Sequence, residues 1–226
     1  MSGHGQFLKT VRIFYSKTAR AKYVSHLDTM RTITRALRRS RVPLWYTEGF
    51  NPHLYLTFAL PLSLGYEGQC ESFDVRLTAE MDLDTLTKRI NAAMPMGFEV
   101  LRAAEPVMEP KAIVWADYQI RLLYAPADRE HARQSFEVFD SQPVIEVQKK
   151  TKKGEKMVDI RPLVQTLSAQ WGETGVALTL RIASGITTNI NPTLYLKAFY
   201  QWANREPEGV RVVRTAILDE NLREFC

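Results

Sequence analysis

Residues 23–43 restrict the possible folds more than any other stretch, because they predict one well-defined helix between two extended segments. Ser25 is a good N-cap, and Asp28 lies three residues later, where an acidic residue completes a capping box. Pro43 ends the helix shortly after Arg41. Between these signals, apolar residues recur every three or four positions and define one helix face. They are Leu27, Met30, Ile33 and Leu37.

The other side of this predicted helix carries a stripe of four arginines: Arg31, Arg35, Arg38 and Arg39. Simple solvation of a polar face is one explanation for such a stripe. Like charges that have no acid in the same two turns repel one another, however, and this favours a surface that faces phosphate groups. Lys22, in the loop before the helix, belongs to the same predicted phosphate-binding set.

Charge is distributed unevenly along the chain, which has 30 Lys and Arg against 25 Asp and Glu, a net charge of +5. Residues 9–41 contain ten basic residues and one acid, whereas residues 42–110 contain four basic residues and ten acids. Such segregation is typical of an oriented electrostatic face and predicts an anionic partner. No apolar run is long enough to span a bilayer, and no amphipathic helix pattern has large apolar anchors, so we expect no membrane contact.

The sequence has two cysteines, Cys70 and Cys226. Two such distant cysteines predict no disulfide framework, and the chain has no signal-peptide pattern at its start. We therefore expect a protein of the reducing cytoplasm.

Strand and helix patterns alternate through the first half of the chain. The predicted elements are a strand at 11–15, the arginine helix, a bent strand at 44–47 and 54–60, a strand at 71–77, a helix from 82 and a strand at 98–101. The order strand, helix, strand, strand, helix, strand predicts a ferredoxin-like (βαββαβ) unit in residues 1–110.

The second half, residues 111–226, predicts a variant of the same unit with an extra hairpin. Its predicted elements are a strand at 116–124, a helix at 128–139, a hairpin of 144–147 and 156–160, a short helix at 162–168, a strand at 176–182, a helix from 192 and a strand at 210–217. The predicted fold class is therefore α+β, with two ferredoxin-like units.

The extra hairpin carries five lysines: Lys149, Lys150, Lys152, Lys153 and Lys156. Lysines at an exposed hairpin tip keep it soluble, which is one explanation. A finger that follows a phosphate backbone and releases counterions is the other, and we include these lysines in the predicted nucleic-acid-binding set.

His26 is the candidate for acid–base chemistry. A helix N-terminus disfavours the imidazolium form, which leaves a neutral base near pH 7. With Lys22 and Tyr23 beside it, the residue types suit a metal-independent ribonuclease in which His26 deprotonates the 2′-hydroxyl. Alternatively, His26 packs and hydrogen-bonds in the first helical turn. A metal site of His26, His53 and Cys70 has no short-loop ligand spacing, so we expect no metal.

The loop from Gly49 to His53 is unusual for a connection between strands. Asn51 precedes a proline, which favours a turn. Phe50 and His53 offer rings that could stack on a base, so Phe50, Asn51 and His53 are predicted to contact a base or a partner. Alternatively, Phe50 is part of the core under the loop.

Several of these motifs together resemble a bacterial family of uncharacterised domains linked to radical-SAM proteins. The matching motifs are YVSHLDTMR (23–31), RALRR (35–39), GFNPH (49–53), LPL (60–62), VDIRP (158–162) and VRT (213–215). The resemblance implies a radical-SAM protein as partner rather than a reaction. Genes of that family often lie near those for ribonucleases and ribosomal proteins, which implies ribosomal or transfer RNA as the substrate.

We therefore expect an RNA-binding accessory protein that acts with a radical-SAM partner in RNA modification or processing and has no catalytic activity of its own. We expect no cofactor in this chain, because an iron–sulfur cluster needs closely spaced cysteines. Two alternatives remain. One is a metal-independent endoribonuclease similar to those that process CRISPR RNA, although their glycine-rich loop is absent. The other is a scaffold for the radical-SAM enzyme without RNA contact.

Overall fold

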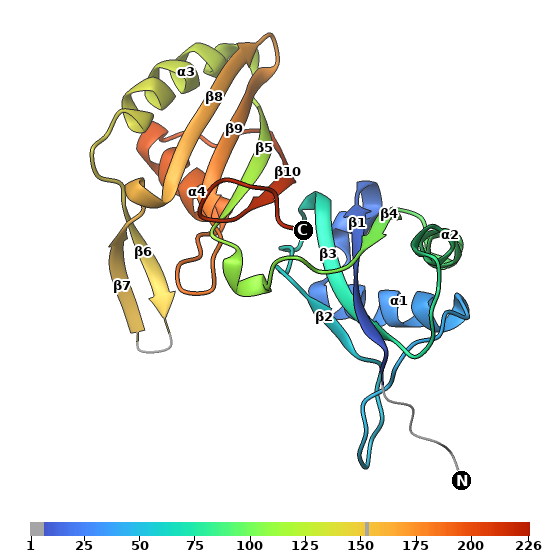
Figure 1. Ribbon diagram of the computed structural model, residues 1–226. Coiled ribbons are helices and arrows are strands. Elements are labelled where there is room, and N and C mark those ends of the chain that lie inside the picture. Colours follow the sequence, from blue (N-terminus) through green and yellow to red (C-terminus); the bar gives the residue numbers. More distant parts are fainter. Residues whose placement is uncertain (1–6, 152–153) are drawn as a thin grey trace. The chain divides into compact units, whose positions relative to one another are not determined.

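The computed structural model describes residues 7–151 and 154–226. The protein is α+β, and its chain divides into two compact units. The first unit runs to Pro110 and includes Cys226, and the second unit is Lys111–Phe225. Figure 1 shows the strands and helices of each unit. No helix of the described residues is long and apolar enough to cross a membrane.

The first unit is an antiparallel sheet with two α-helices. In chain order its elements are β1 (Lys9–Lys17), the 3-10 turn η1 (Ala19–Tyr23), α1 (His26–Arg39), β2 (Leu56–Phe58), β3 (Glu67–Leu77), α2 (Leu83–Ala93) and β4 (Phe98–Ala104). Strand β1 lies between β4 and β3, and β2 pairs with β3. The buried core residues come mainly from β1, β3, α1 and α2: Val11, Ile13, Tyr15, Ile33, Leu37, Phe73, Val75, Leu86 and Ile90.

Helix α1 begins and ends where the sequence predicts. Ser25 caps the helix, since its hydroxyl accepts a hydrogen bond from the Asp28 N–H at 3.2 Å. At the other end the Ser40 N–H donates to the Ala36 carbonyl, and the next residue, Arg41, has a left-handed φ of 54°. This residue turns the chain toward Pro43 and separates the helix from the segment that follows.

One residue of the predicted apolar face of α1 is on the surface instead. Ile33 and Leu37 are fully buried, but Leu27 is 64% exposed. At about 100° per residue, Leu27 points roughly 80–120° away from the direction of those two side chains. The first turn of α1 therefore contributes less to the core than the sequence predicts.

The second unit has a four-stranded antiparallel sheet, a separate hairpin and two α-helices. In chain order its elements are the 3-10 turn η2 (Pro110–Ala112), which begins at the boundary, β5 (Trp115–Leu123), α3 (Pro126–Asp140), β6 (Glu146–Thr151), β7 (Gly154–Asp159), the 3-10 turn η3 (Arg161–Leu163), β8 (Val164–Gly172), β9 (Gly175–Ala183), α4 (Pro192–Ala203) and β10 (Gly209–Leu218). The strand order is β10-β5-β9-β8, and β6 pairs only with β7 among the described strands.

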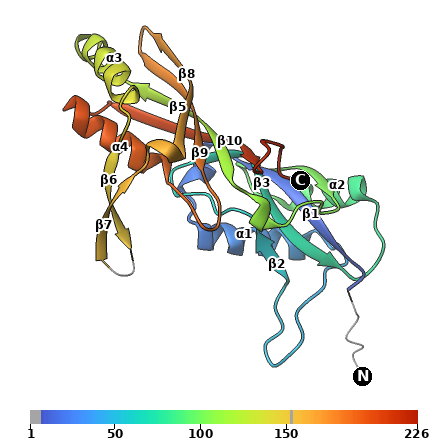
Figure 2. The same cartoon turned by 60° about the vertical axis from the view of Figure 1, so that its left-hand side comes forward.

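Helices α3 and α4 lie together on one side of this sheet (Figure 2). Phe136 of α3 meets Phe199 of α4 edge to face, with 5.2 Å between the ring centroids. Strand β5 alternates beneath the helices, with Tyr118, Ile120 and Leu122 buried. The residues of β5 that alternate with these three, such as Gln119 and Arg121, therefore lie on the opposite face of the sheet.

The short helix predicted at residues 162–168 is wrong. Only a single 3-10 turn, η3, forms at Pro162, and from Val164 the chain is the strand β8. Val164 is buried and pairs with Ile182 of β9. The backbone groups at the edge of β9 need hydrogen-bonding partners, and pairing with them overrides the local helix signal of Pro162.

Arg12 is the largest fully buried side chain of the first unit, with 1% of it exposed. Its Nε and Nη2 atoms donate to the two carboxylate oxygens of Asp74 at 2.8 and 2.9 Å, across the β1–β3 pair. Its Nη1 donates to the backbone oxygens of Met108 and Cys226, each at 2.8 Å. The guanidinium thus joins β1 and β3 to the backbone at residues 108 and 226, which are far apart in the sequence.

We expect Arg12→Ala to lower the free energy of unfolding by about 3–5 kcal/mol, because it leaves the Asp74 carboxylate without its buried partner. Urea denaturation followed by circular dichroism measures this loss. Lys9→Met is the matched control on the same strand. It removes an ion pair of 3.1 Å to the exposed Glu80, for which we expect about 1 kcal/mol or less. Equal losses in the two variants would contradict the role given to Arg12.

Candidate nucleic-acid interface

The exposed side of α1 carries the arginines that the sequence predicts. Arg31, Arg35, Arg38 and Arg39 are all exposed, opposite the buried Ile33 and Leu37. Residues spaced by three or four positions lie on one helix face, so these guanidinium groups form a single surface.

Two of these arginines have defined partners. Arg31 Nη1 lies 3.0 Å from Asp28 Oδ1, and both side chains are more than half exposed, so this ion pair adds little to stability. The Ser25 hydroxyl first, and Arg31 second, lower the pKa of Asp28, which keeps it ionised. Arg39 Nη2 donates to the carbonyl of Ala93 at the end of α2 at 2.8 Å. Helix α1 therefore carries one carboxylate, which pairs with Arg31, against four arginines.

The arginine surface continues beyond α1 into a shallow hollow near the end of α2. Its lining includes Arg39, Arg41, Arg89 and the small residues Ala92 and Ala93. The sequence analysis did not include Arg41, which directly follows the helix, or Arg89, which only the packing of α1 against α2 brings near Arg39. We define the arginine face as Arg31, Arg35, Arg38, Arg39, Arg41 and Arg89.

The residues predicted for catalysis lie at the other end of α1. The ring of His26 is partly buried and meets Phe58 of β2 edge to face, at 5.2 Å between centroids. Lys22 Nζ lies 3.9 Å from Glu67 Oε1 and 5.2 Å from the centre of the Tyr23 ring. Tyr23 itself is 68% exposed. His26 thus makes the packing contact that its alternative interpretation predicts.

A buried ammonium group near His26 was missed by the sequence analysis. Lys17 is 1% exposed, and its Nζ donates to the carbonyl of Val24 at 2.7 Å. Burial first, and the charge of Lys17 second, lower the pKa of His26 below its usual 6.5. The sequence analysis ended the first strand at Tyr15, two residues too early to place Lys17 inside the fold.

Residues 44–55 form an arm that extends away from β2 (Figure 1). The strand predicted at 44–47 is present only as isolated bridges of Leu44 and Tyr46. Near the tip, the Thr47 N–H donates to the His53 carbonyl at 2.8 Å, and the Thr47 hydroxyl lies 2.9 Å from His53 Nδ1. Hydrogen bonds between Thr47 and His53 therefore close the loop that carries residues 48–52.

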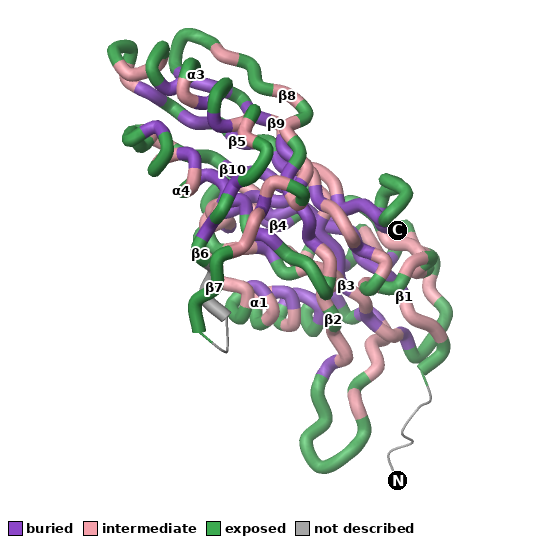
Figure 3. The backbone as a smooth tube through the Cα atoms, turned by 90° about the vertical axis from the view of Figure 1, so that its left-hand side faces the viewer, coloured by how far each residue is buried: buried purple, intermediate pink, exposed green. Residues whose placement is uncertain are grey.

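Phe50 stands at the tip of this arm and is fully exposed. Figure 3 shows the exposed end of the arm in green. Asn51 and His53 are exposed beside it. The alternative that placed Phe50 in the core is wrong, because the hydrogen-bonded arm carries the loop beyond any apolar surface of the first unit that could cover the ring.

The lysine hairpin forms as predicted from β6 and β7, with Lys149 opposite Lys156 in the register. Lys150 also lies on β6, and Lys156 is exposed on β7. Lys152 and Lys153, which complete the predicted set, lie outside the described residues.

No group of three His, Cys, Asp or Glu side chains among residues 7–151 and 154–226 is arranged to hold a metal ion. His26 and His53 belong to different parts of the first unit, the helix start and the arm, and Cys70 lies on β3. Neither Cys70 nor Cys226 forms a disulfide.

The family profile of an uncharacterized protein conserved in bacteria, DUF2344, matches residues 10–192 of this sequence. The chain belongs to this family. The DUF2344 match includes α1 with its arginines, the arm and the lysine hairpin. No curated protein matches the sequence. Among solved structures, an unknown protein from Galdieria sulphuraria is similar over 90% of this chain and 95% of that one, at 12% identity and a TM-score of 0.25, a level that supports no conclusion.

We expect His26 to titrate below pH 6.5, because burial and Lys17 disfavour its charged form. Well above pH 6.5 the ring is neutral in the folded and unfolded states, so its ionisation does not affect stability. As the pH falls below this value, the unfolded state takes up the proton first, so the free energy of unfolding decreases. NMR titration measures the pKa, and urea denaturation from pH 7.5 to 5 measures the loss. His26→Gln should remove part of that loss, and an unchanged pH dependence would contradict this assignment.

Proposed function

We propose that this DUF2344 protein binds RNA and acts as an accessory protein to a radical-SAM enzyme in RNA modification or processing. The arginine face carries this proposal. Arg35 and Arg38 are exposed at its centre, and the single acid of α1, Asp28, is engaged with Ser25 and Arg31. A surface of this composition attracts a polyanion.

Arginine suits this role better than lysine does. Its planar guanidinium donates two parallel hydrogen bonds to a phosphate and is weakly hydrated. Each phosphate that is neutralised releases counterions, so binding depends on salt concentration. Lys22, Lys149, Lys150 and Lys156 add positive charges that we propose also contact phosphates, together with Lys152 and Lys153.

The arm provides the second part of the proposed interface. RNA loops and bulges expose unstacked bases, which proteins bind by stacking on aromatic rings. Phe50 offers a fully exposed ring at the end of a hydrogen-bonded arm, with the polar groups of Asn51 and His53 beside it. We propose that Phe50 stacks on an unpaired base, in ribosomal or transfer RNA, or on a side chain of the partner.

We also propose that each unit is ferredoxin-like. In the first unit the strand order β4-β1-β3-β2 supports this assignment. In the second unit the order β10-β5-β9-β8 corresponds to it element by element, with the β6–β7 hairpin inserted after α3. This fold is shared by many functions, so the proposal rests on the surface residues and not on the fold.

The radical-SAM partnership rests on the resemblance of motifs such as 23–31 and 49–53. Cys70 and Cys226 are far apart in the sequence, and an iron–sulfur cluster is held by several closely spaced cysteines. We propose that the partner carries out the radical chemistry and that this chain binds the RNA.

We expect Arg35→Gln with Arg38→Gln to weaken binding of a single-stranded RNA oligonucleotide roughly tenfold. Two lost phosphate contacts should also lower the slope of log K against log salt by about 1.4. Fluorescence anisotropy between about 50 and 200 mM salt measures both quantities.

The control for this experiment is Arg133→Gln with Arg205→Gln, which removes the same charge from α3 and the segment after α4 of the second unit. Its affinity and salt slope should remain close to those of the wild type. If the α1 variant also behaves like the wild type, the arginine face does not bind phosphate. Tight binding of a radical-SAM protein with no RNA in the complex would favour the scaffold alternative.

We expect Phe50→Ala to weaken RNA binding by about 1–3 kcal/mol if the ring stacks on a base. Thermal stability should not change, because the fully exposed ring makes no core contact. Met96→Ala is the control, since Met96 is a 97% exposed apolar residue of the same unit. Equal RNA affinity in the two variants would mean that Phe50 does not contact a base.

A further inference from the structure

The sheet of the second unit has one covered and one open face. Its covered face packs against α3 and α4 through residues such as Ile120 and Leu122. The open face carries Gln119 and Arg121 of β5, which alternate along the strand with these buried residues and are exposed. A hollow with a volume of about 330 Å³ lies on this open face, across β10, β5, β9 and β8.

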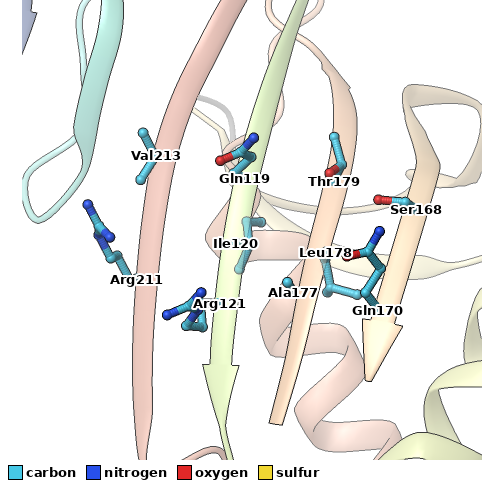
Figure 4. A pocket seen from close by; sticks show the side chains of 10 residues that line it. All are labelled: Gln119, Ile120, Arg121, Ser168, Gln170, Ala177, Leu178, Thr179, Arg211 and Val213. Atoms are coloured by element: carbon cyan, nitrogen blue, oxygen red, sulfur yellow. The ribbon is translucent and has the colours of Figure 1, made fainter. Parts of the chain in front are cut away.

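The strand register arranges eight of the ten lining residues in two rows, and Ile120 and Leu178 lie between these rows along their strands (Figure 4). The first row runs across the four strands as Arg211, Arg121, Ala177 and Gln170. The second row, two residues along, is Val213, Gln119, Thr179 and Ser168. Ala177 is the smallest side chain in the first row, and it leaves space between Arg121 and Gln170.

The lining is rich in hydrogen-bond donors. Two guanidinium groups, two amides and two hydroxyls surround the hollow, and no carboxylate is among the described residues that line it. In the next row, Asp117 of β5 accepts two hydrogen bonds from Arg181, both of 2.8 Å. These bonds raise the pKa of Arg181 and occupy both oxygens of Asp117.

Arg121 and Arg211 lie directly opposite each other on neighbouring antiparallel strands. Side chains in this relation have Cβ atoms about 4.5–5.5 Å apart, so both guanidinium groups can reach one ligand. Each planar group can donate two hydrogen bonds to a phosphate.

We propose that this hollow binds one phosphate-bearing nucleotide unit, and that Arg121 and Arg211 donate hydrogen bonds to its phosphate. Gln119, Gln170, Ser168 and Thr179 then hydrogen-bond the sugar and the base edge. The volume is at the lower end of the range for small-molecule pockets, which suits one nucleotide and not a duplex. No aromatic ring is among the described residues around the hollow, so the proposed recognition relies on hydrogen bonds rather than stacking.

This inference goes beyond the proposed function. It concerns a different unit from the arginine face, and it holds whether the nucleotide belongs to an RNA strand or is free. Two probes separate these sources: 5′-AMP, and a fluorescein-labelled decamer of oligoadenylate. Amide chemical shifts of the full chain report on AMP, and fluorescence anisotropy reports on the decamer.

The test variant is Arg121→Gln with Arg211→Gln, and Arg133→Gln with Arg205→Gln on the helix side of the same unit is the control. We expect the test variant to bind AMP, the decamer or both at least about tenfold more weakly than the wild type, whereas the control does not. Arg121→Lys with Arg211→Lys keeps the charge but not the planar fork, so its affinity should fall between the two. Amide spectra verify that each variant is folded.

Loss of AMP binding alone would assign the site to free nucleotides, and loss of decamer binding alone would assign it to an RNA strand. Either result supports the inference. It is overturned if the wild type binds neither probe, or if the test variant binds both as tightly as the control. The proposed function has its own readout, because Arg35→Gln with Arg38→Gln alters decamer binding and leaves AMP binding in the second unit unchanged.

Discussion

The guanidinium of Arg12 is the charge on which the first unit depends. It is 1% exposed, and all three of its nitrogens donate to oxygens of Asp74, Met108 and Cys226. A buried charge of this kind is tolerated only when its hydrogen bonds are satisfied, and removing one partner leaves the other uncompensated. The β1–β3 register and the positions of residues 108 and 226 in this unit are therefore coupled to one side chain.

The buried charges of β1 also determine which surfaces remain for binding. Lys17 donates to the Val24 carbonyl and so fixes the chain just before the Ser25 cap of α1. With its start held there and Ile33 and Leu37 buried, α1 must turn its arginines to the solvent. The arginine face is thus a consequence of how the core is built, and a phosphate backbone is the partner that we propose for it.

Much of the secondary structure could be predicted from local sequence chemistry. The Ser25, Asp82 and Asn191 caps each accept the hydrogen bond that begins a helix. Most of the predicted strands also form, although residues 44–47 make only isolated bridges. The errors have different origins. The helix predicted from Pro162 followed a local signal, whereas pairing with β9 makes Val164–Gly172 a strand. Leu27 was assigned to the apolar face of α1, but it lies roughly 80–120° around the helix from Ile33 and Leu37 and is exposed.

The sequence by itself determined the arginine helix, the lysine hairpin, the composition of the arm and the motifs of the family, because each depends on residues close together in the chain. Only the tertiary structure decided that Phe50 is exposed, that Arg89 joins Arg39, and that Lys17 is buried near His26. It also placed Arg121 opposite Arg211. These relations depend on strand register and helix packing, which join residues that are distant in sequence.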